Sequence, residues 1–340
     1  MRYLAAALLI ALGSVSSLAG ADNAAAVEAA ITQIRSGKPI APADLTTIEE
    51  GVKSAASANP NDERVRYAIA LIDRAKGERK AAKDSMEALV KQSPAVAEYH
   101  ATYGTLCFET INDAGTFEKM GLASTGRAEY EKAIELNSSL IEPRVGLGKF
   151  FLMAPGYAGG SYRKAEDQAN ALIAIPEGKG EVYGRSLLAD IYADKGDWAK
   201  VEEQYRLAES VTGSNANPSA AMRGYAQALL NKKKDPAAAL VVLERYQSIA
   251  APDDARPWYL TGEAKKALGD DEGAIAGYAK AIAIDPASKN SRFSLAELLE
   301  KTKKYTEAAV QYKDFATRFP ADSRAETASQ AAARCETKAK

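Results

Sequence analysis

Apolar residues recur every three or four positions along most of the chain, a spacing that places them on one face of an α-helix. The strict alternation of apolar and polar residues that is typical of a half-buried β-strand is missing after Ala21. Alanine supplies much of the apolar content, and alanine combines the highest helix propensity with a small side chain. The pattern therefore predicts an all-α protein built from many short, closely packed helices.

Two segments near the C-terminus superimpose at a spacing of about 34 residues. Four residues of the first coincide with four of the second: Ala274, Tyr278, Ala281 and Pro286 with Ala308, Tyr312, Phe315 and Pro320. A small residue lets two helices approach, and an aromatic residue four positions later lies on the same helix face. A proline then ends the helix because it cannot continue the backbone hydrogen bonds. The pair of segments predicts a repeated helical hairpin.

The same order of residues extends upstream. Good copies span residues 63–96, 182–213 and 255–322, and weaker copies lie over 97–177 and 220–253. Period and residue order together resemble the tetratricopeptide-repeat (TPR) family. The resemblance implies a right-handed superhelical solenoid of antiparallel helix pairs, with about seven repeats in residues 61–322.

The ends and the middle of the array depart from this pattern. Residues 22–60 predict a divergent N-terminal hairpin, and residues 323–340 predict a capping helix and tail, because terminal repeats face water. The weaker copies contain extra residues near 110–126 and 153–161, which we expect to form loops on one edge of the array.

In the TPR family the first helix of each repeat lines a concave groove, with repeat positions 2, 5, 9 and 12 pointing into it. Carried onto this sequence, these positions give the following candidate partner-binding residues: Arg64, Tyr67, Arg74, Lys149, Tyr183, Asp190, Arg256, Tyr259, Glu263, Lys266, Asn290, Phe293 and Glu297. Tyrosine and arginine supply much of the binding energy at protein interfaces. The resemblance thus implies that a protein or peptide partner binds here.

Residues 1–21 predict a cleaved signal peptide. A basic residue, Arg2, precedes an apolar stretch, and small residues ending at Ala21 offer a cleavage site. The apolar stretch is shorter than the roughly 20 residues that a membrane-spanning helix needs. We therefore expect a periplasmic or secreted protein, cleaved after Ala21, without stable membrane insertion.

The composition limits the chemistry. The 44 basic and 45 acidic residues alternate along the chain, so the basic surface that nucleic-acid binding requires is not expected. A single histidine, His100, and two cysteines, Cys107 and Cys335, argue against metal sites and acid-base catalysis, and no cofactor is predicted. His100 and Cys107 share one helix face and could form a nucleophilic pair, but core packing is favoured. A disulfide between the two cysteines is not favoured.

The second insertion is rich in glycine and offers a candidate loop site at Gly156, Gly159, Gly160 and Ser161. A glycine-rich loop before a helix can bind an anion, and Ser161 is suited to cap that helix. The lysine and the preceding strand of a phosphate-binding P-loop are missing, which favours an ordered connecting loop.

These features favour a non-enzymatic scaffold or adaptor that binds a partner segment in its groove. The alternative is a binding module for a peptide or glycan, which would use the groove aromatics and the glycine-rich loop.

Overall fold

The computed structural model describes residues 23–36, 40, 42–213, 217–320 and 322–340. All regular elements over these ranges are helices, and no strand occurs among them, as the sequence pattern predicted. The predicted signal peptide, residues 1–21, lies outside the described residues. The chain divides into two compact units, Met1–Gly160 (unit 1) and Ser161–Lys340 (unit 2), and their boundary falls within the second insertion.

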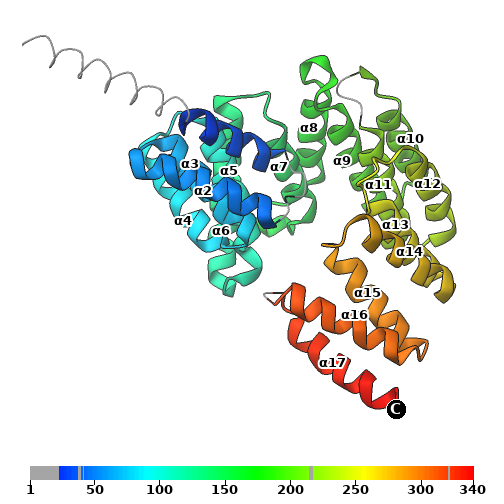
Figure 1. Cartoon of the computed structure of the whole chain (residues 1–340). Coiled ribbons are helices and arrows are strands. Elements are labelled where there is room, and N and C mark those ends of the chain that lie inside the picture. The colour runs from blue at the N-terminus through cyan, green and yellow to red at the C-terminus, as the bar shows by residue number, and fades with distance from the viewer. Residues whose placement is uncertain (1–22, 37–39, 41, 214–216, 321) are drawn as a thin grey trace, which may run out of the picture. The chain divides into compact units, whose positions relative to one another are not determined.

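Unit 1 is a succession of short helices, each packed against the next (Figure 1). A helix over residues 23–35 is followed by α2 (Pro42–Ala58), α3 (Glu63–Lys76), α4 (Arg79–Gln92), α5 (Ala97–Thr110), η1 (Ile111–Asp113), α6 (Thr116–Leu136), α7 (Ile141–Met153) and η2 (Gly156–Ala158).

Unit 2 continues the succession with a π-helical turn in its middle. Its elements are α8 (Tyr162–Ile173), η3 (Pro176–Gly178), α9 (Glu181–Asp194), α10 (Trp198–Glu209), α11 (Pro218–Ala228), η5 (Leu229–Lys233), α12 (Pro236–Ile249), α13 (Arg256–Ala267), α14 (Asp271–Ile284), α15 (Lys289–Lys301), α16 (Tyr305–Arg318) and α17 (Ala325–Lys338). The helix over 23–35 and the odd-numbered helices from α3 onward are called first helices below.

The cores form where the repeat pattern predicted them. Ala274, Tyr278 and Ala281 are completely buried on α14. A Cβ atom at Gly262 of α13 would lie 2.5 Å from the ring of Tyr278, so only glycine allows this approach of the two helices. The equivalent residues of α16 are also buried, and α15, α16 and α17 pack side by side around them (Figure 1).

The hairpin turns repeat with the same hydrogen bonds. After α13, Gly269 adopts a left-handed conformation with φ 82°, and its N–H donates to the carbonyl of Lys266. At the same place after α15, Lys303 adopts φ 62° and donates to Glu300. A left-handed residue is the ordinary end of a helix, and glycine is the residue that adopts it without steric cost.

The loop expected over residues 110–126 is largely helical, so this prediction was wrong. After η1 and a short break, α6 already begins at Thr116 and continues for 21 residues. The helix includes these residues because α6 packs closely on α5 near Gly126. A Cβ atom at Gly104 of α5 would lie 3.0 Å from the carbonyl oxygen of Gly126, so the two backbones approach closely. Glycine in this segment lowered its helix propensity and suggested a loop, whereas in the fold Gly126 permits close helix packing.

Candidate partner-binding site

Except for Lys266, the predicted groove residues of α13 and α15 form three rows, because equivalent positions on the two helices are one repeat period apart. The row at the fifth repeat position is aromatic and consists of Tyr259 and Phe293, both half-buried. The ring centroid of Tyr259 lies 6.0 Å from that of Tyr278, and Phe293 lies 5.1 Å from Phe315. Each ring thus packs one side on the core and keeps part of its surface accessible.

A basic row with internal partners borders the aromatic one. Arg256 Nε lies 2.6 Å from Asp254, and Arg324, which precedes α17, lies 2.8 Å from Asp322. Arg324 also donates to Asn290 Oδ1 at 3.1 Å and places its guanidinium 4.9 Å from the ring centroid of Phe293. The hydrogen bond from Arg324 holds the pKa of Asp322 well below its usual range.

An acidic row lies on the other side of the aromatic one and consists of Glu263 and Glu297. Tyr278 donates its hydroxyl proton to Glu263 Oε1 at 2.5 Å, and Ser294 Oγ lies 3.4 Å from the same oxygen. Burial raises the pKa of Tyr278, and this hydrogen bond raises it further, so the phenol stays protonated and donates. Glu297 is exposed. We call Tyr259, Phe293, Glu263 and Glu297 the unit 2 strip.

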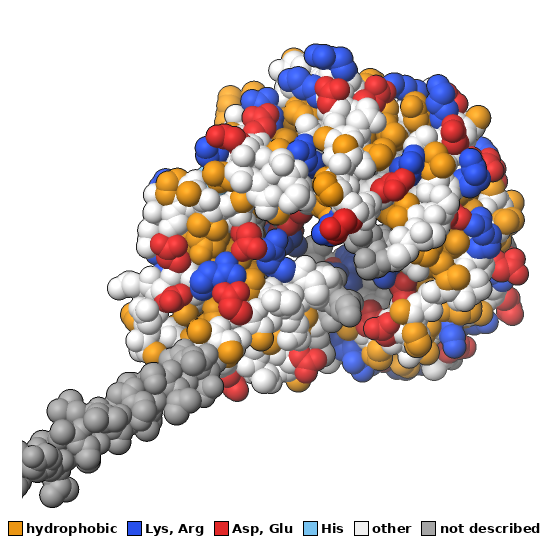
Figure 2. All heavy atoms as spheres, turned by 90° about the horizontal axis from the view of Figure 1, so that it is seen from above, with side chains coloured by type: hydrophobic (Ala, Val, Ile, Leu, Met, Phe, Trp, Pro, Cys, Tyr) orange, Lys and Arg blue, Asp and Glu red, His pale blue; other side chains and the backbone are white. Residues whose placement is uncertain are grey.

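The remaining candidates of unit 2 lie outside this strip. Lys266 is exposed at the end of α13, at the twelfth repeat position. Tyr183 on α9 is 42% exposed, and Asp190 on the same helix is half-buried and faces Lys232 at 3.9 Å. Acidic and basic side chains are interspersed on the face that Figure 2 shows.

In unit 1 the expectation of an exposed aromatic at the fifth position was wrong. Tyr67 is completely buried, its hydroxyl lies 2.9 Å from Thr102 Oγ1, and its ring centroid lies 5.0 Å from that of Tyr99. The side chains of α5 therefore cover this tyrosine. Lys149 on α7 is exposed.

The two predicted arginines of unit 1 are engaged in ion pairs within the unit. Arg64 bonds Glu28 at 2.6 Å and Glu98 at 3.0 Å, and Arg74 bonds Glu109 at 2.7 Å. The bonds to Glu28 and Glu98 raise the pKa of Arg64 more than its burial lowers it. These arginines join neighbouring first helices to one another.

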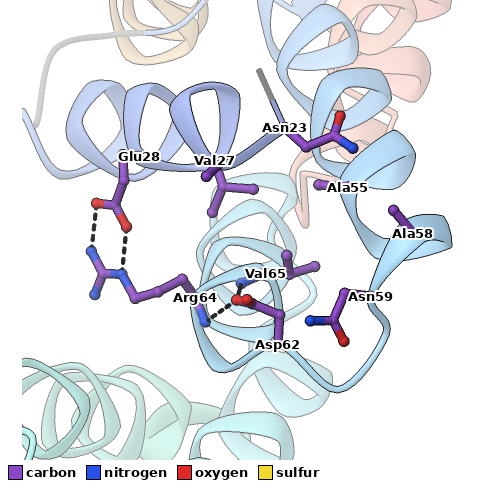
Figure 3. Close-up of a pocket in the computed structure, with 10 residues that line it drawn as sticks. Asn23, Val27, Glu28, Ala55, Ala58, Asn59, Asp62, Arg64 and Val65 are labelled. Atoms are coloured by element: carbon purple, nitrogen blue, oxygen red, sulfur yellow. Dashed lines mark hydrogen bonds and ion pairs between the residues drawn. The ribbon is translucent and has the colours of Figure 1, made fainter. Parts of the chain in front are cut away.

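A small pocket adjoins the first of these pairs (Figure 3). It has a volume of about 270 Å³ and lies between the helix over 23–35, the end of α2 and the start of α3. Val27, Ala55 and Val65 form an apolar wall, while the carboxylate of Asp62 caps α3 by accepting from the backbone of Arg64 and Val65. Its charged groups, Glu28, Asp62 and Arg64, are thus engaged in contacts that hold the helices together.

His100 and Cys107 both belong to the core of unit 1. One ring nitrogen of His100 lies 2.5 Å from Glu129 and the other lies 3.0 Å from the carbonyl of Pro94, so both are occupied. Cys107 is completely buried, and burial raises its thiol pKa to about 12. A thiol in that environment is protonated and inert at neutral pH. Cys107 and Cys335 are both free.

The glycine-rich loop is ordered by its own backbone. The amides of Ala158 and Gly160 both donate to the carbonyl of Pro155, and that of Gly159 donates to Gly156. The amides of Gly159 and Gly160 are therefore engaged within the loop and not available to an anion. Ser161 does cap α8, as predicted, by accepting from the backbone of Lys164.

Within the described ranges, no group of three or more His, Cys, Asp or Glu side chains could hold a metal ion. None of the helices that the structure describes is long and apolar enough to cross a membrane.

Comparisons with known proteins agree with the geometry. Residues 255–288 match the family model described as tetratricopeptide repeat. No curated protein matches the chain significantly. A tetratricopeptide repeat protein from Parabacteroides merdae has a similar structure at 17% identity and a TM-score of 0.54, with 82% of this chain and 98% of that chain covered. Yeast Tom70 is similar at 14% identity and a TM-score of 0.64, with 87% of this chain and 58% of that chain covered.

Residues 255–288 are thus a tetratricopeptide repeat, and the chain has the all-α repeat fold of TPR proteins. The identities to the two solved structures are low, so they show the fold alone. Within that TPR fold, sequence reasoning missed Arg324 and Ser294. The repeat period could have found Arg324, because it is the equivalent of Asn290 and Arg256 in the next repeat. Ser294 stands outside the four groove positions, so the repeat pattern does not single it out.

Proposed function

We propose that this TPR protein is a non-enzymatic scaffold or adaptor that binds a segment of a partner protein along the unit 2 strip. We further propose that it is exported to the periplasm or secreted, on the basis of the signal-peptide pattern in residues 1–21. Fractionation and an intact mass that begins at Asp22 would test export, and a full-length cytoplasmic protein would contradict it.

The observation that carries the binding proposal is the aromatic row. Tyr259 and Phe293 are held rigidly by Tyr278 and Phe315 yet keep part of their surface open to solvent. Rigid aromatic side chains flanked by polar groups are typical of the residues that dominate protein interfaces. Tyr67, at the equivalent position of unit 1, has no exposed surface to offer.

Site-specific photocrosslinking tests this proposal. A photoreactive phenylalanine analogue is placed at position 293 and, as a matched control, at Val241 on α12, a second helix on which this side chain is 63% exposed. We expect a discrete crosslinked partner in cells from position 293 and none from position 241. The crosslink should disappear when Tyr259→Ala is added. Equal products from both positions would contradict the proposal.

The alternative, a peptide or glycan module that uses the glycine-rich loop, has less support. The loop amides are bonded to the loop itself, and the first groove aromatic is buried. A binding site made from this loop would have to break hydrogen bonds that order it.

A further inference from the structure

Residues about one repeat period apart lie beside one another on neighbouring first helices. In unit 1 this spacing joins opposite charges: Arg64 bridges Glu28 and Glu98, and Arg74 pairs with Glu109. Each arginine of one repeat thus neutralises a glutamate of the next or the previous repeat. The face of unit 1 that these helices share is electrostatically satisfied by its own side chains.

The last two first helices of unit 2 follow the same rule at Glu300 and are joined by a second bond at Asn290. Arg334 on α17 binds Glu300 on α15 at 2.8 Å, and Arg324 binds Asn290, each from one repeat to the next. The hydrogen bond from Arg334 lowers the pKa of Glu300 more than burial raises it. Glu300 is thus ionised and fully committed to its partner.

The unit 2 strip breaks the rule. Glu263 on α13 has another glutamate, Glu297, at the equivalent position of the next repeat on α15. Ser294, one turn before Glu297, reaches Glu263 Oε1, which shows that these two helix faces meet. Burial raises the pKa of Tyr259, and the charges of both glutamates raise it further, so both carboxylates act on one phenol. Over the described residues, neither glutamate makes an ion pair with a lysine or arginine.

The nearby cations, Arg324 and Lys266, do not form ion pairs with Glu263 or Glu297. The charge of Glu297 raises the pKa of Arg324, but the guanidinium of Arg324 is already hydrogen-bonded to Asp322 and Asn290. Lys266 lies one turn after Glu263 and is exposed, and its ammonium group makes no ion pair within the described part of the chain. Two ionised carboxylates near one another repel. A cation from outside the chain would relieve this repulsion.

We infer that the partner segment presents a lysine or arginine side chain to Glu263 and Glu297, while its neighbouring apolar side chains pack on Tyr259 and Phe293. This inference rests on the proposed function, because it names the partner chemistry of the same strip. Glu263 is well suited to such a contact, since the hydrogen bonds from Tyr278 and Ser294 fix its carboxylate and leave Oε2 for the partner. A fixed anion loses little freedom when it binds.

A phage library of random dodecapeptides, panned against the purified protein, tests the chemistry directly. We expect selected peptides to be enriched in lysine or arginine next to apolar residues. Their affinity should fall at least tenfold in the Tyr259→Ala, Phe293→Ala double variant and also in Glu297→Arg. It should fall with rising salt concentration, because the contact is between charges.

The variant Glu307→Arg is the matched control. Glu307 is an exposed glutamate on α16, the second helix of the same repeat, so the change in net charge is identical. Its affinity for the selected peptides should equal that of the unaltered protein. An equal loss in Glu307→Arg and Glu297→Arg would overturn the inference, since the effect would then reflect net charge.

Two further outcomes separate the inference from the proposed function. Peptides that need Tyr259 and Phe293 but show no basic residues, and that still bind Glu297→Arg, would overturn the inference and leave the binding site in place. A selection in which no peptide depends on Tyr259 and Phe293 would overturn both.

The melting temperature of the free protein gives a second test, because replacing a glutamate that only stabilises the fold would not raise it. Glu297→Arg rebuilds the opposite-charge arrangement of unit 1, so the melting temperature of the free protein should rise by about 1 °C while binding is lost. A lower melting temperature for Glu297→Arg than for Glu307→Arg would contradict the like-charge argument.

Discussion

Unit 1 and unit 2 use the same repeat differently on their first-helix faces. In unit 1 the tyrosine at the fifth position is buried and the arginines are paired with glutamates of neighbouring repeats. In unit 2 the aromatic residues at the fifth position remain half exposed, and two glutamates occupy equivalent positions of successive repeats. The same repeat therefore gives unit 1 a first-helix face whose contacts stabilise the unit, and unit 2 a first-helix face that is available to a partner.

The difference arises from the next repeat and not from the residue itself. Tyr67 turns inward because Thr102 accepts or donates a hydrogen bond at the neighbouring position and the ring of Tyr99 lies beside it. At Tyr259 the equivalent of Thr102 is Ser294, which also forms a hydrogen bond to the phenol, but the equivalent of Tyr99 is Ser291, which has no ring to cover it. A buried tyrosine needs a polar partner for its hydroxyl; the partner of Tyr67, Thr102, is itself buried, whereas Ser294 beside Tyr259 is half-buried.

The largest expected effect separates the two tyrosines. Tyr67→Ala should lower the free energy of unfolding by about 3–5 kcal/mol, because it removes a fully buried aromatic side chain and leaves a cavity. Tyr259→Ala, at a half-buried position, should cost roughly half as much and should abolish partner binding. Denaturation followed by circular dichroism measures both losses.

Fluorescence assigns each loss to its unit. Both tryptophans, Trp198 and Trp258, lie in unit 2. The denaturation midpoint measured by tryptophan fluorescence should therefore report the stability that Tyr259→Ala removes from unit 2. If Tyr67→Ala were no more costly than Tyr259→Ala, the enclosure of Tyr67 would not be the stabilising feature described above.

The sequence was sufficient for the fold because the repeat is a local pattern. The spacing of Ala274, Tyr278 and Ala281 states which face of a helix is buried, and all three are buried in the structure. The start of α6 was missed for a related reason. Local propensity disfavoured a helix through Gly126, but the close approach of Gly104 on α5, a contact between distant residues, stabilises it.

The candidate site was less predictable, because the position of a residue in the repeat does not determine how exposed its side chain is. The same fifth position gave buried Tyr67 and half-exposed Tyr259. Arg64 was expected in the groove, and its two glutamate partners come from the preceding and the following repeat. Comparing each charge with the residue one repeat period away would have found these pairs, and would also have singled out Glu263 and Glu297.

A smaller effect is expected when the ion pairs of unit 1 are broken. Arg64→Met keeps an apolar stem over the ring of Tyr67 but removes the charge that binds Glu28 and Glu98. All three side chains are at least one third exposed and therefore screened, so the loss should be about 1 kcal/mol at neutral pH and low salt. It should shrink at about 1 M salt.

The same variant has a defined pH dependence. The hydrogen bond from Arg64 lowers the pKa of Glu28, and in Glu98 the arginine contacts outweigh the burial that would raise it. A lowered pKa contributes stability above the unfolded value, about 4.3 for glutamate, and that stability is lost as the pH falls through the folded value. The difference between Arg64→Met and the unaltered protein should therefore be full at pH 7 and vanish in acid. A difference that persists below about pH 3 would show that packing, not charge, is responsible.

The smallest effect concerns the turns that connect the helices of each hairpin. Unit 1 uses Gly77 with φ 86° after α3, whereas unit 2 uses Lys303 with φ 62° after α15, and both donate to the carbonyl three residues earlier. A side chain in the left-handed region costs about 1–2 kcal/mol, and glycine loses roughly 0.5–1 kcal/mol through its greater freedom when unfolded. Lys303→Gly should therefore stabilise unit 2 by about 0.5–1 kcal/mol, and Gly77→Lys should destabilise unit 1 by a similar amount. Tryptophan fluorescence should detect the gain in Lys303→Gly, and a loss there would mean that the lysine side chain contributes a contact that outweighs the strain of its backbone.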